Sequence, residues 1–129
     1  GVRVVVIDAA ERVLLIRHSY GSAHWMLPGG GIKRDEDARA AAAREVFEEA
    51  GLVIEDAVEI GRVTEIIHGS NNDVRVVVGW TEGMPRADLR EITDAEFFAP
   101  GALPHGISSR LPALLPGYVK AAEAARRLR

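Results

Sequence analysis

The chain has 129 residues, 47% of them hydrophobic and 27% charged, a length and composition that suit one globular domain with its own core. Its formal net charge of −3 excludes a strongly basic surface, so we expect no polymeric nucleic acid as a partner. It has no cysteine, which excludes disulfides and thiolate metal sites and is typical of a reducing compartment.

The chain opens with two short apolar runs. Residues 2–8 and 12–17 are apolar runs that contain β-branched residues, which predicts two strands of a largely buried sheet. No signal peptide stands at Gly1 and no run of about 18 apolar residues occurs, so we expect a cytoplasmic protein with no membrane partner. A further short strand is predicted from Trp25, and it breaks at Pro28 and the three glycines that follow.

A helix is predicted over about residues 36–50. Asp35 suits its N-cap, alanines fill its first half, and Gly51 is a natural stop. At 100° per residue its apolar side chains, Val46 and Phe47 among them, form one stripe. We expect this stripe to pack against the sheet while the acidic side chains of the helix point away from it.

The second half of the chain continues the mixed pattern. Residues 57–69 and 73–80 predict longer strands joined by the turn SNND, and residues 96–100 predict a short strand. Helices are predicted over residues 107–115 and 117–129. No repeat or linker divides the chain, so we expect one α/β domain over residues 1–129.

The strongest chemical signal is the segment REVFEEAG in the predicted helix. Its Glu45, Glu48 and Glu49 stand at i, i+3 and i+4, where carboxylates repel one another, and the single Arg44 cannot neutralise all three. A solvated acidic face is the ordinary explanation of such a cluster. Here, however, a glycine turn precedes the helix, so backbone carbonyl groups can approach the acids. Carboxylate and carbonyl oxygens are the ligands that Mg²⁺ and Mn²⁺ prefer, which favours a cation between these acids.

Residues 30–52 resemble the Nudix box, G-x5-E-x7-R-E-U-x-E-E-x-G-U with U aliphatic, and every specified position matches. The resemblance implies an α/β/α sandwich with a mixed β-sheet and a loop–helix–loop catalytic element. It also implies a hydrolase that uses Mg²⁺ or Mn²⁺. Such an enzyme cleaves the pyrophosphate linkage of a nucleoside diphosphate joined to a group X.

The resemblance also assigns roles to residues. By their positions in the box, Glu45, Glu48 and Glu49 would bind the metal together with the Gly30 carbonyl. Glu45 and Glu48 would thereby act in catalysis, and Arg44 would orient the glutamates through charge-assisted hydrogen bonds. The metal would spread the developing negative charge and lower the pKa of the attacking water.

The general base stays open between a box glutamate and an acid of a later loop. The segment REITDAEFF resembles a later segment of the family, which makes Glu91 the candidate, with an exposed loop glutamate as the alternative interpretation. Glu65 is the second candidate, because it shares a strand face with Val63 and Ile67 and needs a partner if buried. We expect Glu36 to brace the loop rather than contact the metal.

Few residues point to a particular substrate. Trp25 could stack on a base, although packing in the core is the alternative interpretation. Segments typical of several specialised branches of the family are absent, which favours nucleoside triphosphates or a small nucleotide-linked metabolite. A non-catalytic nucleotide- or metabolite-binding module is the second hypothesis, but the complete set of acids favours catalysis. A homodimer is left open.

Overall fold

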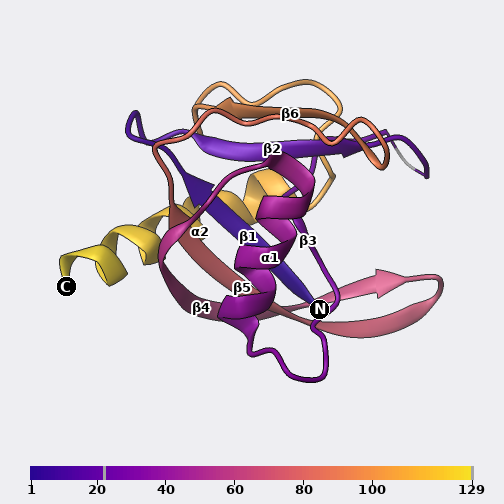
Figure 1. Ribbon diagram of the computed structural model, residues 1–129, viewed down its shortest axis with the longest axis horizontal. Coiled ribbons are helices and arrows are strands. Elements are labelled where there is room, and N and C mark those ends of the chain that lie inside the picture. The colour runs from indigo at the N-terminus through magenta and orange to yellow at the C-terminus, as the bar shows by residue number, and fades with distance from the viewer. Residues whose placement is uncertain (22, 129) are drawn as a thin grey trace.

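The computed structural model describes residues 1–21 and 23–128, with two helices on opposite faces of one mixed β-sheet (Figure 1). Helix α1 (Ala38–Ala50) covers one face and helix α2 (Leu111–Arg127) covers the other. This is the α/β/α sandwich that the sequence predicted. Across the described residues the strand order is β4-β5-β1-β2-β6, with β3 paired to β1. The strands are β1 (Val2–Ile7), β2 (Val13–His18), β3 (Gly29–Gly30), β4 (Glu55–Ile67), β5 (Ser70–Trp80) and β6 (Ile92–Phe98).

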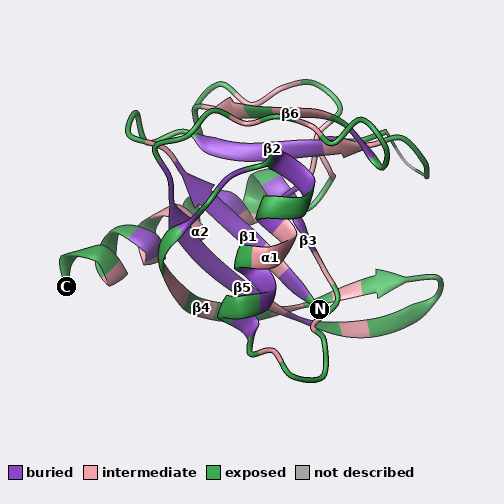
Figure 2. Ribbon diagram, viewed as in Figure 1, coloured by how far each residue is buried: buried purple, intermediate pink, exposed green. Residues whose placement is uncertain are grey.

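The central strands are buried on both faces of the sheet (Figure 2). Strand β1 runs parallel to β5 and antiparallel to β2, and its side chains alternate between the two faces. Val4 and Val6 pack with α1, whereas Val5 and Ile7 pack with α2. Burial on both faces explains why residues 4–7 of this strand form an apolar run rather than alternating with polar residues.

Helix α1 begins two residues later than predicted. Its N-cap is Asp37, whose carboxylate accepts a hydrogen bond from the Ala40 N–H at 2.8 Å, so the prediction of Asp35 as the cap was wrong. The helix ends as expected at Gly51, which has a φ of 67° and donates its N–H to the Phe47 carbonyl at 3.0 Å. Local hydrogen bonds therefore fix both ends of the helix.

The buried face of α1 differs from the predicted stripe. Alanines and Val46 face the sheet as expected, but Glu49 is only 8% exposed while Phe47 is 61% exposed. The expectation that all the acids point away from the sheet was therefore wrong for Glu49. The small alanine side chains let the helix approach the sheet closely, and the Glu49 carboxylate finds the backbone N–H of Gly29 there.

Strands β4 and β5 form one long hairpin that projects from the body of the molecule (Figure 1). Its turn lies at His68 and Gly69, with φ of 51° and 79°, so the prediction of a turn at SNND was wrong. Two consecutive residues with positive φ form the tight turn that matches the twist of a hairpin. The polar residues that resembled a turn instead begin β5, where Ser70 pairs with Ile67.

One C-terminal helix stands where two were predicted. Helix α2 continues through Pro116, and the residues just before Leu111 are irregular. A proline inside a helix removes one backbone hydrogen bond. Burial of Leu111, Leu115 and Ala122 against the sheet compensates for that loss and keeps the helix continuous. Within the described residues, neither helix combines the length and apolar character that crossing a bilayer requires.

Strand β3 passes very close to β1. A β-carbon added at Gly29 would lie 2.0 Å from the Val2 carbonyl oxygen, and one added at Gly30 would lie 2.6 Å from a carboxylate oxygen of Glu45. One added at Gly31 would meet nothing within 4 Å. The backbone therefore requires the first glycine, and an acidic side chain occupies the space beside the second.

We expect Gly29→Ala to destabilise the protein by about 3 kcal/mol or more, because the new methyl group meets a rigid backbone carbonyl of β1. Gly31→Ala is the matched control, in the same loop and with open space around it. Urea unfolding of the two variants measures the difference. Equal free energies of unfolding would contradict the close approach of β3 to β1.

Candidate active site

Arg44 is the centre of the polar contacts on α1. Its Nε and Nη2 donate to the Glu36 carboxylate at 2.6 and 2.9 Å, and these bonds raise the pKa of the guanidinium above its usual range. Its Nη1 donates to Glu45 at 2.8 Å and to Glu48 at 3.4 Å. Its Nη2 also donates to the Gly31 carbonyl at 2.9 Å. One arginine thus joins three carboxylates to the glycine loop.

Glu36 holds the loop that leads into the helix. Its carboxylate accepts a hydrogen bond from the Lys33 N–H at 2.9 Å in addition to the two from Arg44. The Arg44 hydrogen bonds, and after them the one from Lys33, lower the pKa of Glu36 to about 2. These are the contacts of a side chain that braces the loop, the role that the sequence indicated.

Glu49 has a different environment from the other acids of the helix. Its Oε1 accepts the Gly29 N–H at 3.0 Å, and its side chain is only 10% exposed. Burial raises the pKa of Glu49 to about 8, with a further rise from the Glu45 charge, while the Gly29 hydrogen bond acts in the opposite direction. In the absence of a cation, Glu49 therefore holds a proton at neutral pH.

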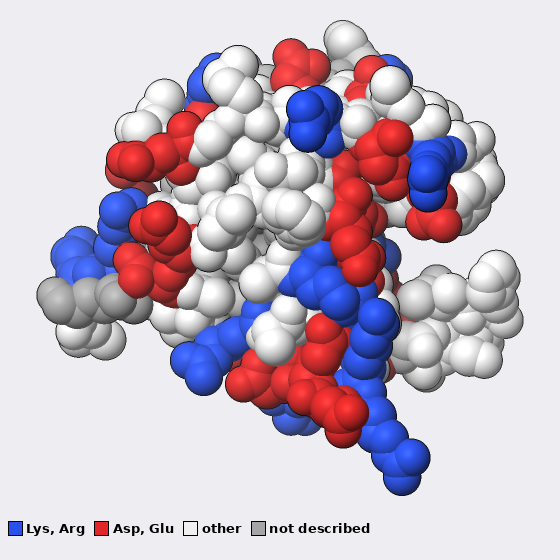
Figure 3. All heavy atoms as spheres, viewed as in Figure 1, with Lys and Arg blue, Asp and Glu red and all other residues white. Residues whose placement is uncertain are grey.

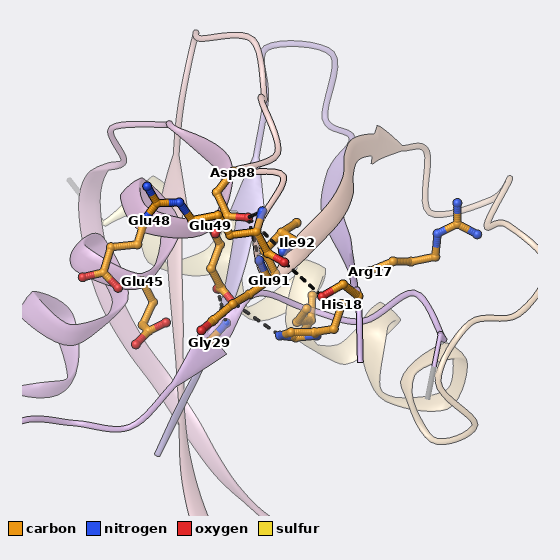
Figure 4. Close-up of polar contacts among 12 residues, drawn as sticks. Arg17, His18, Gly29, Glu45, Glu48, Glu49, Asp88, Glu91 and Ile92 are labelled. Carbon is orange, nitrogen blue, oxygen red and sulfur yellow. Dashed lines mark hydrogen bonds and ion pairs between the residues drawn. The ribbon is translucent and has the colours of Figure 1, made fainter. Parts of the chain in front are cut away.

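The three glutamates of the box do not converge on one point (Figure 4). Glu45 and Glu48 contact Arg44. Glu49 turns toward Gly29, as Figure 4 shows. Among residues 1–21 and 23–128, no group of three or more histidine or acidic side chains is placed to hold a metal ion. Figure 3 shows acidic and basic groups side by side on the face that α1 covers. Arg44 binds one oxygen of Glu45 and one of Glu48, so a cation bound here would take the other oxygen of each carboxylate.

The donor set nevertheless fits a divalent cation. Glu45 lies directly against the Gly30 backbone, at a distance that leaves no room for a β-carbon. Glu49 holds a proton in a position from which a cation can displace it. Carboxylates beside a glycine backbone offer the oxygen ligands that Mg²⁺ and Mn²⁺ take.

A histidine that sequence reasoning missed lies beside these acids. The Nε2 of His18 is 3.7 Å from the Glu49 carboxylate. Burial, and after it the Arg3 charge, lower the pKa of His18. The charges of Glu91 and Asp88 act in the opposite direction, so both acids lie within electrostatic range of the imidazole. No motif in the sequence marks His18, which stands one residue beyond the predicted strand over residues 12–17 and is the last residue of β2.

Asp88 shapes the loop that carries Glu91. Its Oδ1 accepts hydrogen bonds from three successive backbone N–H groups at 2.8, 3.1 and 2.9 Å, those of Arg90, Glu91 and Ile92. Burial opposes ionisation, but these bonds outweigh it and lower the pKa of Asp88. The Glu91 carbonyl accepts the Ser19 N–H at 2.7 Å, which ties the loop to the end of β2. The structure thus brings the predicted Glu91 to the same region as Glu49 (Figure 4).

The other two residues that the sequence selected lie in different environments. Glu65 has the partner that its strand face required, an ion pair with Arg3 at 3.1 Å. Trp25 is only 7% exposed. The Arg17 guanidinium lies 4.5 Å from its ring centroid, and the Phe98 ring meets it edge-on at 4.9 Å. Trp25 therefore packs in the core and offers no open face on which a base could stack.

The fold is an α/β/α sandwich in which a glycine turn leads into a helix with clustered acids. These features define a class of α/β domain that has its active site beside this helix. A family model described as "NUDIX domain" matches residues 1–118. The chain therefore belongs to the NUDIX family of hydrolases. Members of this family generally use divalent metals.

Curated relatives match the chain over part of its length. An RNA pyrophosphohydrolase of Teredinibacter turnerae is 45% identical over 64 residues, which cover 50% of this chain and 37% of that protein. Diphosphoinositol polyphosphate phosphohydrolase 2 of Rattus norvegicus is 37% identical over 71 residues, which cover 55% of this chain and 37% of that protein. The match thus spans well under half the length of both relatives.

A solved structure extends the likeness of fold to the whole chain. A hydrolase of the NUDIX family from Clostridium perfringens superposes with a TM-score of 0.76 at 20% identity. The superposition covers 99% of this chain and 96% of that one. At this identity the likeness concerns the fold, and it includes α2 beyond the residues that the family model matches.

The stability of the metal-free protein should reveal the proton on Glu49. The folded-state pKa of Glu49 is raised from 4.5 to about 8. Its stabilising contribution to the free energy of unfolding is therefore complete below pH 4.5 and is lost as the pH rises to 8. The loss is on the order of a few kcal/mol. His18, with its lowered pKa, contributes with the opposite sign, so the measured quantity is the difference between the native protein and Glu49→Gln.

Thermal unfolding in EDTA and in saturating Mg²⁺ tests this expectation. Mg²⁺ should raise the melting temperature of the native protein more at pH 8 than at pH 6, because at the lower pH it competes with the proton on Glu49. In EDTA, parallel pH profiles for the native protein and Glu49→Gln would show that Glu49 does not titrate in this range. An Mg²⁺ effect independent of pH would show that the cation does not displace its proton.

Replacing Arg44 with lysine should weaken Mg²⁺ binding by about 10- to 100-fold, since an ammonium group cannot span three carboxylates and a carbonyl at once. Arg39→Lys on the same helix is the control, because Arg39 is exposed and its one ion pair within the described part of the chain, with Asp37, is long at 3.7 Å. Isothermal titration with Mg²⁺ measures both variants. Unchanged affinity in Arg44→Lys would remove Arg44 from the site.

Proposed function

We propose that the chain is a divalent-metal-dependent pyrophosphohydrolase that cleaves the pyrophosphate linkage of a nucleoside diphosphate joined to a group X. Nucleoside triphosphates are the simplest substrates of this class. The observation that carries the proposal is the arrangement of the complete set of box acids, with Glu45 and Glu48 on Arg44 and with Glu49 buried against the Gly29 N–H. Such an arrangement brings together carboxylates that can bind a cation, and the cation can in turn bind a phosphate group of the substrate.

Glu45, Glu48 and Glu49, with the Gly30 carbonyl, are the groups that would hold Mg²⁺ or Mn²⁺. When bound, the metal supplies charge neutralisation for the phosphate oxygens and a lower pKa for the attacking water. Arg44 positions Glu45 and Glu48 through its hydrogen bonds and ties them to the glycine loop. Glu49 would lose its proton when a cation binds to its carboxylate.

Glu91 is the residue to which we assign the role of general base. Glu91 is exposed and lies on a loop that hydrogen bonds to Asp88 hold in place. Its negative charge raises the pKa of His18, which lies beside Glu49. Its carboxylate can therefore take the proton of a water molecule that attacks phosphorus at the site. His18, whose pKa is lowered mainly by burial, stays neutral at pH 7 and adds no positive charge that would oppose a cation.

The test is phosphate release from a panel of substrates, with Mg²⁺ or Mn²⁺, for the native protein and for Glu48→Gln. The panel contains canonical and oxidised nucleoside triphosphates, ADP-ribose, nucleotide sugars, dinucleoside polyphosphates, 5′-triphosphate RNA and a diphosphoinositol polyphosphate. We expect hydrolysis of one substrate class and a loss of roughly 100-fold or more in Glu48→Gln. Replacing a metal ligand should cost at least as much as replacing one of its hydrogen-bonding partners.

The control variant is Glu123→Gln, an exposed glutamate of α2 that should leave activity unchanged. Both variants should keep the native stability within about 0.5 kcal/mol, since both side chains are exposed. If the protein hydrolysed no substrate of the panel but still bound nucleotides, the result would favour the non-catalytic binding module. Cleavage of the RNA alone would overturn the expectation that no polymeric nucleic acid is a partner.

A cytoplasmic location and a homodimer stay predictions.

A further inference from the structure

The loop before β6 holds an unfavourable backbone conformation. Leu89 has a φ of 63°, in the left-handed region that suits glycine, and its side chain is 81% exposed, so no burial compensates for the strain. This conformation lets three successive backbone N–H groups reach one oxygen of Asp88. They belong to Arg90, Glu91 and Ile92 and lie at 2.8, 3.1 and 2.9 Å. Strain that is kept in place by a hydrogen-bonded side chain indicates a functional constraint on the loop.

The carbonyl groups of the same loop are bonded to Ser19, the first residue after β2. The Ser19 N–H donates to the Glu91 carbonyl at 2.7 Å, and the Ser19 hydroxyl donates to the Arg90 carbonyl at 3.0 Å. The two peptide groups on either side of the Glu91 α-carbon therefore each have their N–H on Asp88 and their carbonyl on Ser19. We call this set of four hydrogen bonds the Ser19–Asp88 clamp. It restricts both backbone dihedral angles of Glu91.

A β-bulge adjoins the clamp on both strands. Two successive residues of β2, Arg17 and His18, pair with Asp94 and Ile92, so the residue between the last two has no partner on β2. A bulge of this kind turns the side chains beside it in a new direction and is often found next to active sites. The register shift therefore stands where the end of β2 meets the loop that carries the predicted base.

The same end of β2 contacts the buried acid of α1. The Nε2 of His18 lies 3.7 Å from the Glu49 carboxylate, and Ser19 is the next residue. Figure 4 shows Glu91 in the region of Glu49. One strand end thus contacts the acid with one residue and fixes the Glu91 loop with the next.

We propose that Ser19 and Asp88 are positioning residues of the hydrolysis, which act through Glu91 by fixing the backbone from which its carboxylate extends. The inference rests on the proposed function and on the assignment of Glu91 as general base. A base must lie within hydrogen-bond reach of the proton that it takes, and a displacement of about 1 Å can lower a rate about 100-fold. Loss of the clamp should therefore lower kcat and leave KM unchanged.

Asp88→Ala removes the acceptor of all three N–H groups. Steady-state kinetics on the substrate that the panel identifies should show a loss of about 10- to 100-fold in kcat at unchanged KM. Asp88→Asn keeps an acceptor oxygen in this position and should restore most of the rate. Ser19→Ala removes only the hydroxyl bond and should cause a smaller loss.

Asp8→Ala is the matched control. Asp8 also accepts two backbone N–H groups, those of Ala10 and Arg12 at 3.1 and 2.8 Å, in a turn that contains a non-glycine residue with positive φ, Glu11. This turn joins β1 to β2 and lies at the opposite end of β2 from His18. The control should keep the native kcat. Circular dichroism and melting temperatures establish that the variants are folded, and Ser19→Ala carries the test if Asp88→Ala does not fold.

A double-mutant cycle with Glu91→Gln separates positioning from a general structural effect. Glu91→Gln alone should lower kcat by roughly 100- to 10,000-fold, the contribution of a general base. Adding Asp88→Ala to it should cause little further loss, because the clamp acts through the carboxylate that is already gone. An effect of Asp88 on the structure as a whole would instead lower kcat by the same factor in both backgrounds.

Hydrogen exchange in EDTA gives a readout that does not depend on activity. The amides of Arg90, Glu91 and Ile92 should exchange about tenfold or more faster in Asp88→Ala than in the native protein, since their acceptor is removed. In Asp8→Ala they should exchange at the native rate.

Native kcat in Asp88→Ala, unchanged exchange of the three amides, or equal losses with and without the Glu91 carboxylate would each overturn the inference and leave the proposed function intact. Hydrolysis at the native rate in Glu91→Gln would also overturn it, because the clamp would have no base to position. Failure of the native protein to hydrolyse any substrate would overturn the proposed function and, with it, the inference.

Discussion

The hydrogen bond from the Gly29 N–H to the Glu49 carboxylate is the contact on which the rest of the site depends. It exists because β3 lies against β1 at a distance that only glycine permits, with the Val2 carbonyl where a β-carbon would stand. The same contact sets the rotation of α1, since it turns an acid toward the sheet and leaves Phe47 in solvent. Backbone packing thus decides which glutamate is buried.

The acids divide into those that have an arginine partner and those that do not. Glu36 binds Arg44 through two hydrogen bonds, and Glu59 and Glu65 likewise each have an arginine. Among the described residues, Glu49 has no arginine or lysine within ion-pair distance, and His18 is its nearest cationic candidate. Burial without a partner costs free energy, which the protein limits by keeping Glu49 protonated. The unpartnered acid is therefore where an external cation contributes most.

The sequence predicted the central strands from apolar runs and the end of α1 from Gly51, and the complete motif indicated the family and the sandwich that it implies, because all of these are local signals. It did not predict which way the helix faces. A helical wheel weighs only hydrophobicity, whereas the donor that buries Glu49 comes from a residue twenty positions earlier. His18 and Asp88 were missed for a related reason: each acts through contacts that the fold assembles, at the end of β2 and in the loop before β6. Trp25 was a candidate by residue type alone, and packing against Phe98 decided its place.

The pairing pattern also separates two kinds of carboxylate chemistry within one small domain. Glu65 keeps a fixed orientation through Arg3 and so suits recognition, which requires an acceptor in one place. Glu49 has no arginine or lysine partner among the described residues, and Arg44 binds only one oxygen each of Glu45 and Glu48, so these residues suit the binding of a cation. Arg3 of β1 is paired with Gly29 of β3, so the residue that holds Glu65 and the residue that holds Glu49 are neighbours in the sheet.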